Sequence, residues 1–429
     1  FIRKDLMLTP LSFSAGFYDL KVLYFGETGL SLFTIFAIAY TPIIILNKFF
    51  SASRHIQKKL NIFLLIFILY LIISKLFPFF AGPVMVLPYT SEYLDLSYEP
   101  LKESIFGIRN LFFPVLYGLT AIAISIQVKT YRQLLNCTSS FIWGVLMIGF
   151  IGLIFQILTI VNYEMSINLI AYLTYGNTFT DEIVARIDYQ SFFGLKRMYT
   201  FAGEPGFSAN LFVFGLGIIL VIKNIGENNS KSFLYHSNIP PLFLFIASIM
   251  TLSTTGILGI LITIFIIIFW ASSNKIKSFL FILFFSILIL LVLVIFDDLR
   301  NYLIQNHLLK LIGGAGSGAI RFVNLQHSID LFMTNPLIGI GYGGHRSTTL
   351  IFSLLVNLGL IGTLIFFMMI LNIIFGNKNV ILNQAVPMGL STALLVWIIL
   401  SPISQTGVAL LFPWLWLVIG LLMSYPSRN

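Results

Sequence analysis

The sequence predicts an all-α membrane protein that crosses the bilayer many times. Hydrophobic residues make up 58% of the 429 residues and charged residues only 10%, and the mean hydropathy is +0.96. A soluble domain carries about a quarter charged residues. Long apolar runs, such as 62–73, 257–270 and 279–296, recur along the chain. A membrane-spanning helix needs about 20 mostly apolar residues, so the composition excludes an ordinary soluble enzyme.

The apolar runs predict a single transmembrane domain over residues 1–429 with about 11–12 helices. Eleven spans can be read directly, at 28–46, 60–80, 105–126, 138–160, 206–223, 239–254, 256–271, 278–296, 350–375, 384–403 and 409–425. The remaining N-terminal stretch, 6–27, is too polar for an ordinary span. Either it forms an additional interfacial or re-entrant element or a further span precedes residue 1, and the sequence leaves both open.

The charged residues predict which side of the membrane each loop faces. The net charge is +9, and cytoplasmic loops are typically enriched in Lys and Arg. Twelve cations and a single acid, Glu227, occupy one set of loops, namely Lys48, Arg54, Lys58, Lys59, Lys129, Arg132, Lys223, Lys231, Lys275, Lys277, Lys378 and Arg428. The alternate loops are rich in acidic residues. We therefore place the basic loops in the cytoplasm, and the positive charge does not indicate nucleic acid.

Three predicted external loops are longer than simple turns, at 81–104, 161–205 and 297–349. Loops of this length are commonly functional, and their many aromatic residues argue against disorder. Apolar residues recur at helical spacing in 166–176 and 321–333. We expect a short helix in each, lying on the outer face, and we expect the functional surface on that side.

Residues 195–205 (LKRMYTFAGEP), at the end of the second external loop, are the first candidate site. Arg197 precedes an apparent helix start at Pro205, and the free N–H groups of a first helical turn favour a phosphate. One interpretation makes Arg197 a diphosphate ligand, with Glu204 as a base or an orienting partner and Tyr199 as a substrate contact. The alternative makes Glu204 a partner of the helix dipole and Arg197 an interfacial anchor. The motif alone leaves both open.

The third external loop contains the second candidate site. Arg321 opens a helical stretch after the glycine-rich segment 313–318 (GGAGSG), and its planar guanidinium can bind a phosphate through two parallel hydrogen bonds. Asp330 follows on the same stretch as a candidate base or substrate contact. The glycine segment lacks the Lys-Ser/Thr ending of a nucleotide-binding loop, so on its own it indicates a hinge or linker.

Two further charged positions lie close to the predicted outer surface. His345 and Arg346 come just before the span at 350–375. Histidine carries protons near neutral pH, so His345 is a candidate base, although a loop histidine is more often structural. Lys75 and Arg109 lie near the outer ends of their spans, and ionisable groups at membrane depth are often functional. Lys75 is expected to extend to the surface, whereas Arg109 either does the same or adds positive charge to a cavity.

The sequence contains none of the patterns that typify common metal sites. Cys137 is the single cysteine, so internal disulfides and cysteine-based metal sites are excluded. There is no HExxH motif and no paired-carboxylate motif of glycosidase type. We therefore expect no metal and no cofactor, with arginines stabilising negative charge where other enzymes use a divalent ion.

Three elements together resemble the signature of the O-antigen polymerase and ligase superfamily. These are Arg321, the segment 335–341 (NPLIGIG) and the segment 354–362 (LLVNLGLIG). Residues 197–205 resemble the earlier arginine motif of its polymerase branch (Wzy type). Ligases tend to place a histidine at a position that corresponds here to about Thr348, whereas the nearest histidine is His345. This departure favours the polymerase.

The resemblance implies a GT-C-like, metal-independent glycosyltransferase in a bacterial inner membrane, with its active site facing the periplasm. Donor and acceptor would be undecaprenyl-diphosphate-linked glycans, and a chain-length regulator (Wzz type) and a flippase (Wzx type) would be partners. Arg197 and Arg321 would bind the diphosphates, with Arg346 and Arg109 in secondary roles. His345, Glu204 and Asp330 remain alternative bases.

Two other functions remain open. One is an O-antigen ligase, which uses the same chemistry on a different acceptor. The other is a polysaccharide or lipid transporter without catalysis. A transporter is expected to carry charged groups along a central path, whereas the ionisable groups in the predicted spans, Lys75 and Arg109, both lie toward the outer end. This distribution favours chemistry at one surface.

Overall fold

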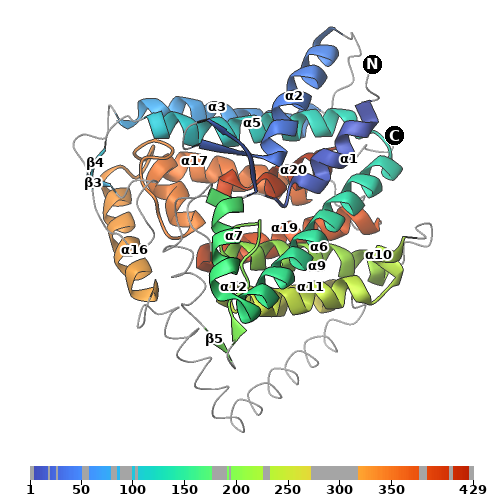
Figure 1. The fold of residues 1–429 in the computed structure, drawn as a ribbon. Coiled ribbons are helices and arrows are strands. Elements are labelled where there is room, and N and C mark those ends of the chain that lie inside the picture. Colours follow the sequence, from blue (N-terminus) through green and yellow to red (C-terminus); the bar gives the residue numbers. More distant parts are fainter. Residues whose placement is uncertain are drawn as a thin grey trace.

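Helices make up almost all of the secondary structure that the structure describes (Figure 1). The structure, a computed structural model, describes residues 4–17, 20–25, 28–50, 58–78, 85–86, 99–101, 105–175, 191–192, 195–225, 232–271, 317–375, 384–404 and 409–424. Among these described residues, four helices are long and apolar enough to cross a membrane, α5 (Ile105–Gln127), α6 (Tyr131–Val161), α9 (Pro205–Ile225) and α17 (Leu350–Phe375). The prediction of an all-α polytopic membrane protein is confirmed.

Shorter apolar helices account for the other predicted spans that the structure describes. They are α2 (Leu32–Phe50), α3 (Lys58–Ile73), α11 (Ile239–Met250), α12 (Thr254–Ala271), α19 (Ala385–Ser404) and α20 (Pro413–Met423). The predicted span at 278–296 lies outside the described residues. Hydropathy thus located the spans well, because a polar backbone can cross lipid only with its hydrogen bonds satisfied, as in a helix.

The N-terminal stretch that was too polar for a span forms a short helix and a hairpin. Helix α1 (Lys4–Ser14) packs along α6, where a side chain at Gly144 would collide with the carbonyl group of Phe13. Strands β1 (Lys21–Phe25) and β2 (Thr28–Ser31) form an antiparallel pair. This stretch therefore forms a helix and a hairpin of its own, and an interfacial or re-entrant position in the membrane stays a prediction.

The two short helices expected in the external loops are present. They are α7 (Tyr163–Tyr175) and α16 (Ser317–Thr334). Small strand pairs accompany them, β3 (Met85–Val86) with β4 (Glu99–Pro100) and β5 (Ser191–Phe192) with β6 (Leu195–Lys196). Figure 1 shows α16, β3 and β4 on the left and the short helix α10 (Phe233–His236) on the right. The predicted external elements α16, β3 and β4 therefore lie on the side of the bundle opposite the predicted cytoplasmic helix α10.

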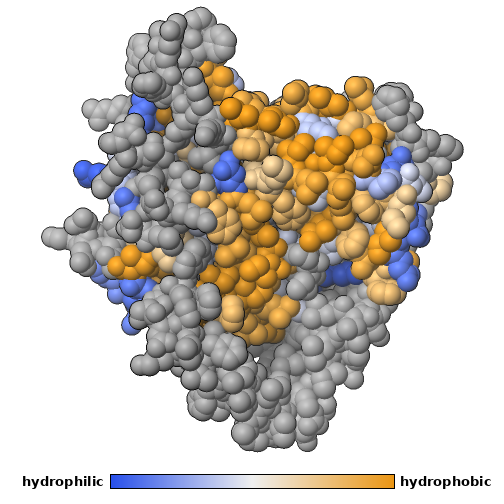
Figure 2. Space-filling model, turned by 180° about the vertical axis from the view of Figure 1, so that it is seen from behind, coloured by the Kyte–Doolittle hydropathy of each residue, from blue (hydrophilic) through white to orange (hydrophobic). Residues whose placement is uncertain are grey.

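Helix α6 exposes an apolar stripe that requires a lipid environment. Residues 143, 147, 150, 154 and 157 recur every three or four positions, so they share one helix face. Their large apolar side chains are between 40% and 64% exposed along this stretch and its continuation to Ile160. Figure 2 shows a broad apolar area on one face of the molecule. Burying this surface in hydrocarbon removes the cost of exposing it to water.

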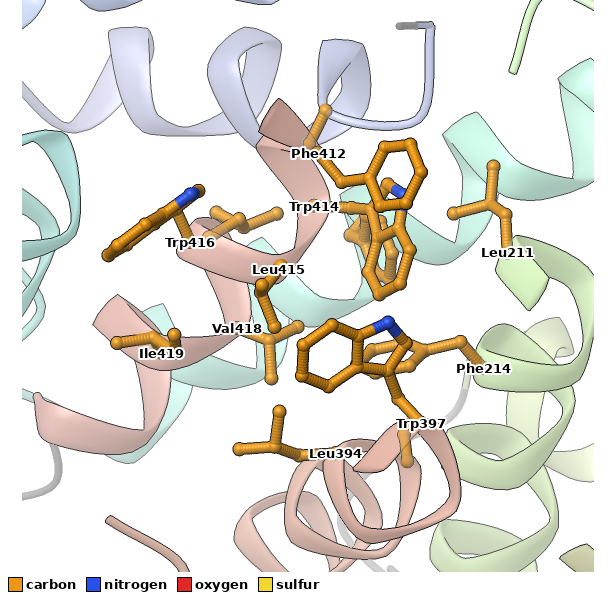
Figure 3. Packing of buried hydrophobic residues seen from close by; sticks show 14 of the residues in the cluster. Leu211, Phe214, Leu394, Trp397, Phe412, Trp414, Leu415, Trp416, Val418 and Ile419 are labelled. Carbon is orange, nitrogen blue, oxygen red and sulfur yellow. The ribbon is translucent and has the colours of Figure 1, made fainter. Parts of the chain in front are cut away.

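Helix α20 forms the centre of the core, and every residue from Pro413 to Met423 is buried. A helix that is apolar all round is expected in such a place. Trp414 stacks on Phe412 with ring centroids 5.5 Å apart and meets the edge of Trp397 from α19 (Figure 3). The indole N–H of Trp416 donates to the carbonyl of Leu410, so its polar atom is satisfied.

Helix α17 is broken in its first half, and the break defines the position of the loop before it. Gly359 has φ 65° and ψ −173°, values that no helix contains. Its backbone therefore cannot continue the helical hydrogen-bond ladder. The preceding loop supplies the missing partners. The amides of Leu360 and Ile361 donate to the carbonyls of Pro336 and Leu337, at 2.8 and 3.1 Å.

The same loop also satisfies carbonyl groups on the other side of the break. The amides of Ile340 and Gly341 donate to the carbonyls of Val356 and Asn357, each at 2.9 Å. Gly339 comes so close that an added Cβ would lie 2.6 Å from the amide nitrogen of Gly359. The segments 335–341 and 354–362 are therefore two halves of one interlocked unit, which explains why both are rich in glycine.

Replacing Gly359 by alanine should disrupt the hydrogen bonds between the loop and α17. The added methyl would meet the backbone of Leu337 and Ile338, and the positive φ disfavours any side chain. We expect the free energy of unfolding to fall by about 2 kcal/mol or more, measured by thermal unfolding in detergent. Gly217→Ala is the matched control, because its new methyl would lie 3.6 Å from its nearest neighbour. Equal stability of the two variants would contradict the interlocked arrangement.

Candidate active site

A buried polar cluster fastens α16 to the loop that leads into α17. His345 has 0% of its surface exposed. The Ser328 hydroxyl of α16 lies 3.0 Å from Nε2 of His345 and 3.1 Å from Oγ of Ser347. It also donates to the carbonyl of Asn324, one turn earlier, at 2.8 Å. A single serine thus joins the helix to the loop.

The backbone on either side of the His345 peptide is held by two asparagines. Asn357 of α17 accepts from the amide of His345 through Oδ1 and donates to its carbonyl through Nδ2, both at 2.8 Å. Asn324 of α16 donates to the carbonyl of Arg346 at 3.2 Å. Because each asparagine is almost fully buried, these bonds are shielded from water. These hydrogen bonds fix the backbone at His345 and Arg346, and so fix the positions from which the two side chains extend.

Burial keeps His345 uncharged at neutral pH. Desolvation, with a smaller contribution from the nearby His327, lowers the pKa of His345 from 6.5 to about 3. The two imidazole rings lie 5.4 Å apart at 63°. A general base works best with a pKa near the operating pH. In this arrangement His345 is suited to positioning α16 and Arg346, and its role as a base stays a prediction.

Arg321 lies on the face of α16 that meets this loop. Positions 321, 324 and 328 are three and four residues apart, so their side chains line one side of the helix. Asn324 and Ser328 contact the loop, and Arg321 continues their row one turn earlier, half-buried. Arg346 is half-buried as well, whereas Asp330 is exposed. Arg321, His345 and Arg346 therefore all lie on one structural unit, formed by α16 and the loop that leads into α17.

Strand β3 and the end of α3 enclose the same region. His327 of α16 hydrogen-bonds to the carbonyl of Met85 at 3.0 Å. The amide of Tyr342 donates to the hydroxyl of Ser74, in the short 3₁₀ helix η1 (Ser74–Leu76) that follows α3. Elements that are far apart in the sequence, η1 and β3 on one hand and α16 on the other, thus meet around the loop 335–349.

Arg197 is supported by a different part of the bundle. Its Nε donates to the carbonyl of Thr251 at 3.4 Å, at the C-terminal end of α11. The amide of Met198 donates to the carbonyl of Met250 at 3.1 Å. A cation at a helix C-terminus interacts favourably with the helix dipole. This contact fits the interpretation of Arg197 as an anchor, and binding of a diphosphate stays a prediction.

The remainder of the 197–204 loop is packed into the bundle rather than open to solvent. Tyr199 is 1% exposed and belongs to the hydrophobic core. Glu204 is half-buried, directly before α9, and its carbonyl accepts from the amides of Phe207 and Ser208. Its place at the start of α9 suits a partner of the helix dipole. Contact of Tyr199 and Glu204 with substrate stays a prediction.

Arg109 and Lys75 lie on helices that border the loop. Arg109 belongs to α5, and its side chain lies outside the described part of the chain. Lys75 lies in η1 and is half-buried. Within the described ranges, no group of three His, Cys, Asp or Glu side chains is placed to hold a metal ion.

Residues 241–353 match a family model described as O-antigen ligase. The matched segment begins inside α11, contains α12 and α16 and ends just inside α17, so it includes Arg321, His345 and Arg346. A comparison with curated proteins finds no match. The family match supports the O-antigen polymerase and ligase superfamily and an enzyme of this membrane-bound type. It does not separate a polymerase from a ligase.

Several residues that organise this site had no role in the sequence-based prediction. Ser328, Asn324 and Asn357 form the polar cluster, and Gly359 makes the break in α17. One signal was available for Asn357, because an amide inside an apolar span needs partners. Its partners lie in a loop twelve residues away, which the local sequence pattern does not reveal.

Protonation of His345 should destabilise the fold in acid. The unfolded chain binds this proton near pH 6.5, whereas the folded chain binds it only near pH 3. Between these values the unfolded state holds more protons, so the stability falls as the pH falls. We expect the loss from this group to approach about 1.4 kcal/mol per pH unit between pH 6 and pH 4.

This acid sensitivity can be measured by comparing wild type with His345→Gln, whose amide does not titrate. Thermal unfolding in detergent should depend less on pH in His345→Gln than in wild type. His236→Gln is the control, because His236 is exposed on α10, away from the cluster. If all three proteins lose stability in parallel, His345 is not a buried neutral histidine.

Proposed function

We propose that this protein is a membrane glycosyltransferase that polymerises undecaprenyl-diphosphate-linked oligosaccharide repeat units at the periplasmic face of a bacterial inner membrane. The observation that carries the proposal is the polar cluster that joins α16, which bears Arg321, to the loop before α17, which bears Arg346. The family match over 241–353 supports the same class of chemistry. The charge pattern of the loops supports the orientation.

The proposed reaction is a displacement at a sugar carbon. A hydroxyl oxygen of the acceptor glycan forms a bond to the anomeric carbon of the donor, and the bond from that carbon to the diphosphate oxygen breaks. The hydroxyl proton passes to a base, and the lipid diphosphate leaves with the electron pair. Negative charge grows on the diphosphate as the bond breaks. Cations fixed beside it stabilise this transition state more than the ground state.

In this proposal Arg321 and Arg346 act on one diphosphate, with Arg109 adding positive charge. Arg197, on its separate support at α11, acts on the second lipid-linked substrate. A polymerase needs two such substrates at once, so two supports suit the reaction. Asp330 is the most accessible of the three alternative bases, because it is exposed whereas Glu204 is half-buried and His345 is buried.

An O-antigen ligase is the second candidate function. The family model that matches the chain carries this description, which favours the ligase. The position of His345, displaced from the place where ligases tend to have a histidine, favours the polymerase. The products separate the two. A polymerase yields long chains on lipid diphosphate, whereas a ligase moves finished chains to another acceptor. A transporter would yield neither product in a reconstituted reaction.

Removing the guanidinium of Arg321 should abolish most of the transfer. In proteoliposomes with a defined undecaprenyl-diphosphate-linked repeat unit, we expect Arg321→Ala to reduce the rate by about 100-fold or more. Arg321→Lys should recover part of this loss, because an ammonium keeps the charge but lacks the planar fork. Product length on a gel measures the result.

Arg132→Ala is the matched control, because Arg132 is exposed near the start of α6, at the predicted cytoplasmic end. It should retain the wild-type rate. A normal rate in Arg321→Ala would exclude Arg321 from the reaction. In cells lacking the native protein, Arg321→Ala and Arg197→Ala should leave single-repeat glycans. Long unattached lipid-linked chains would instead indicate a ligase.

A further inference from the structure

Helix α16 carries an exposed apolar stripe beside the face that contacts the loop. Phe322, Ile329 and Met333 are 47%, 39% and 70% exposed. They lie seven and four residues apart, so they share one face of the helix. Asn324 and Ser328, which hydrogen-bond to the loop, lie on a different face and are buried. The polar cluster therefore leaves the stripe uncovered.

A third face of α16 has the composition of a surface in contact with water. Asp330 and Thr334 are exposed there, four residues apart. Val323 lies on the same face and is 45% exposed, and a single apolar side chain among polar ones is ordinary on such a surface. A contiguous stripe of large apolar side chains instead indicates a contact with a partner or a membrane.

The stripe is continuous with an apolar surface of α17. Beyond the break in α17, large apolar side chains that are 44% to 53% exposed recur every three or four positions, namely Leu360, Leu364, Met368 and Leu371. Leu337, 62% exposed, follows the end of α16 by three residues. Its carbonyl accepts from the amide of Ile361 at 3.1 Å. Leu337 therefore links the exposed apolar stripe of α16 to that of α17.

The depth of this link corresponds to the outer edge of the hydrocarbon. Residues 360–375 form about 24 Å of helix, and the hydrocarbon core is about 30 Å thick. Because residue 375 is at the predicted cytoplasmic end, Leu337 lies near the opposite boundary. Figure 1 shows α16 running across the direction of α3 and α5 rather than along it. An amphipathic helix with this direction and depth fits the membrane interface.

We infer that α16 lies in the interface of the leaflet on the predicted external side, with Phe322, Ile329 and Met333 inserted among the acyl chains. Lipid is the occupant of the stripe, because the stripe continues the exposed apolar surface of α17 and lies at the same boundary. The face that carries Asp330 meets water. The bilayer thus holds α16 from one side, while the loop 335–349 holds it from another.

In this position Arg321 lies at the depth of the lipid headgroups. It precedes Leu325 by one turn and Ile329 by two turns, between the lipid-facing stripe and the face that contacts the loop. A lipid-linked diphosphate carries its charge at the same depth, while its polyprenyl tail stays in the hydrocarbon. This step rests on the proposed function: the substrate reaches Arg321 by diffusing within the membrane, rather than from the aqueous phase.

Spin labels on the full chain in lipid nanodiscs test the position of α16. Phe322→Cys and Met333→Cys place a label on the stripe. Val323→Cys and Thr334→Cys are the matched controls, one residue further along the helix and on the wetted face. Wild type gives the labelling background, because its single cysteine, Cys137, is buried. Oxygen concentrates in hydrocarbon and a nickel chelate in water. The ratio of oxygen to chelate relaxation should therefore be severalfold higher at 322 and 333 than at 323 and 334.

Only this alternation between neighbouring positions supports the inference. Stronger relaxation by the chelate at all four positions means that the stripe faces water. Weak relaxation by both reagents at 322 and 333 means that protein covers the stripe, either a second copy of the chain or another partner. Stronger relaxation by oxygen at all four positions means that α16 lies wholly inside the hydrocarbon. Each of these three results overturns the inference.

Met333→Asp tests the delivery of the substrate from the membrane. A carboxylate among acyl chains is unfavourable, so the KM for an undecaprenyl-linked substrate in proteoliposomes should rise by about threefold or more. Thr334→Asp is the matched control at the same end of α16, and its KM should be unchanged. Both variants should keep the same unfolding temperature in detergent, because both positions are exposed. An unchanged KM in Met333→Asp overturns the delivery from the membrane.

The two experiments separate the inference from the proposed function. If the labels alternate and wild type transfers no glycan, the interfacial position of α16 stands and the proposed function fails. If the labels do not alternate and wild type transfers glycan, the interfacial position fails and the proposed function stands.

Discussion

The interlocking of a loop with a broken helix determines the arrangement of this protein's candidate active site. Within hydrocarbon each unpaired backbone group costs several kcal/mol, so α17 can interrupt its ladder at Gly359 only if another backbone replaces the lost partners. Residues 336–341 do so through four hydrogen bonds that cross the break in both directions. Because neither segment is satisfied without the other, the loop is held as firmly as a helix.

That rigidity is what the candidate site requires. Arg346 stands on a backbone clamped by Asn357 and Asn324, and Arg321 stands on a helix fastened by Ser328 to a neutral His345. Charge stabilisation in a reaction depends on donors that are already in place before the charge develops. Arginines on flexible loops would lose conformational entropy when they bind the developing charge. The fixed backbone at Arg346 and the fixed helix at Arg321 avoid this entropic cost.

Hydropathy and helical periodicity predicted the spans and the short helices α7 and α16, because lipid and packing impose regular patterns on sequence. The break in α17 was not predicted, since residues 350–375 are apolar throughout and resemble one span. The burial of His345 was also missed, because a glycine-rich, arginine-bearing loop resembles a solvated one.

Hydrogen–deuterium exchange tests this interlocking most directly. The amides of Ile340, Gly341, Leu360 and Ile361 form the four crossing bonds, although residues 340 and 341 belong to a loop. Peptides covering 338–342 should exchange as slowly as those from the buried helix α20, and Gly359→Ala should accelerate them by orders of magnitude. Exchange of these loop amides within seconds in the wild-type protein would contradict the account.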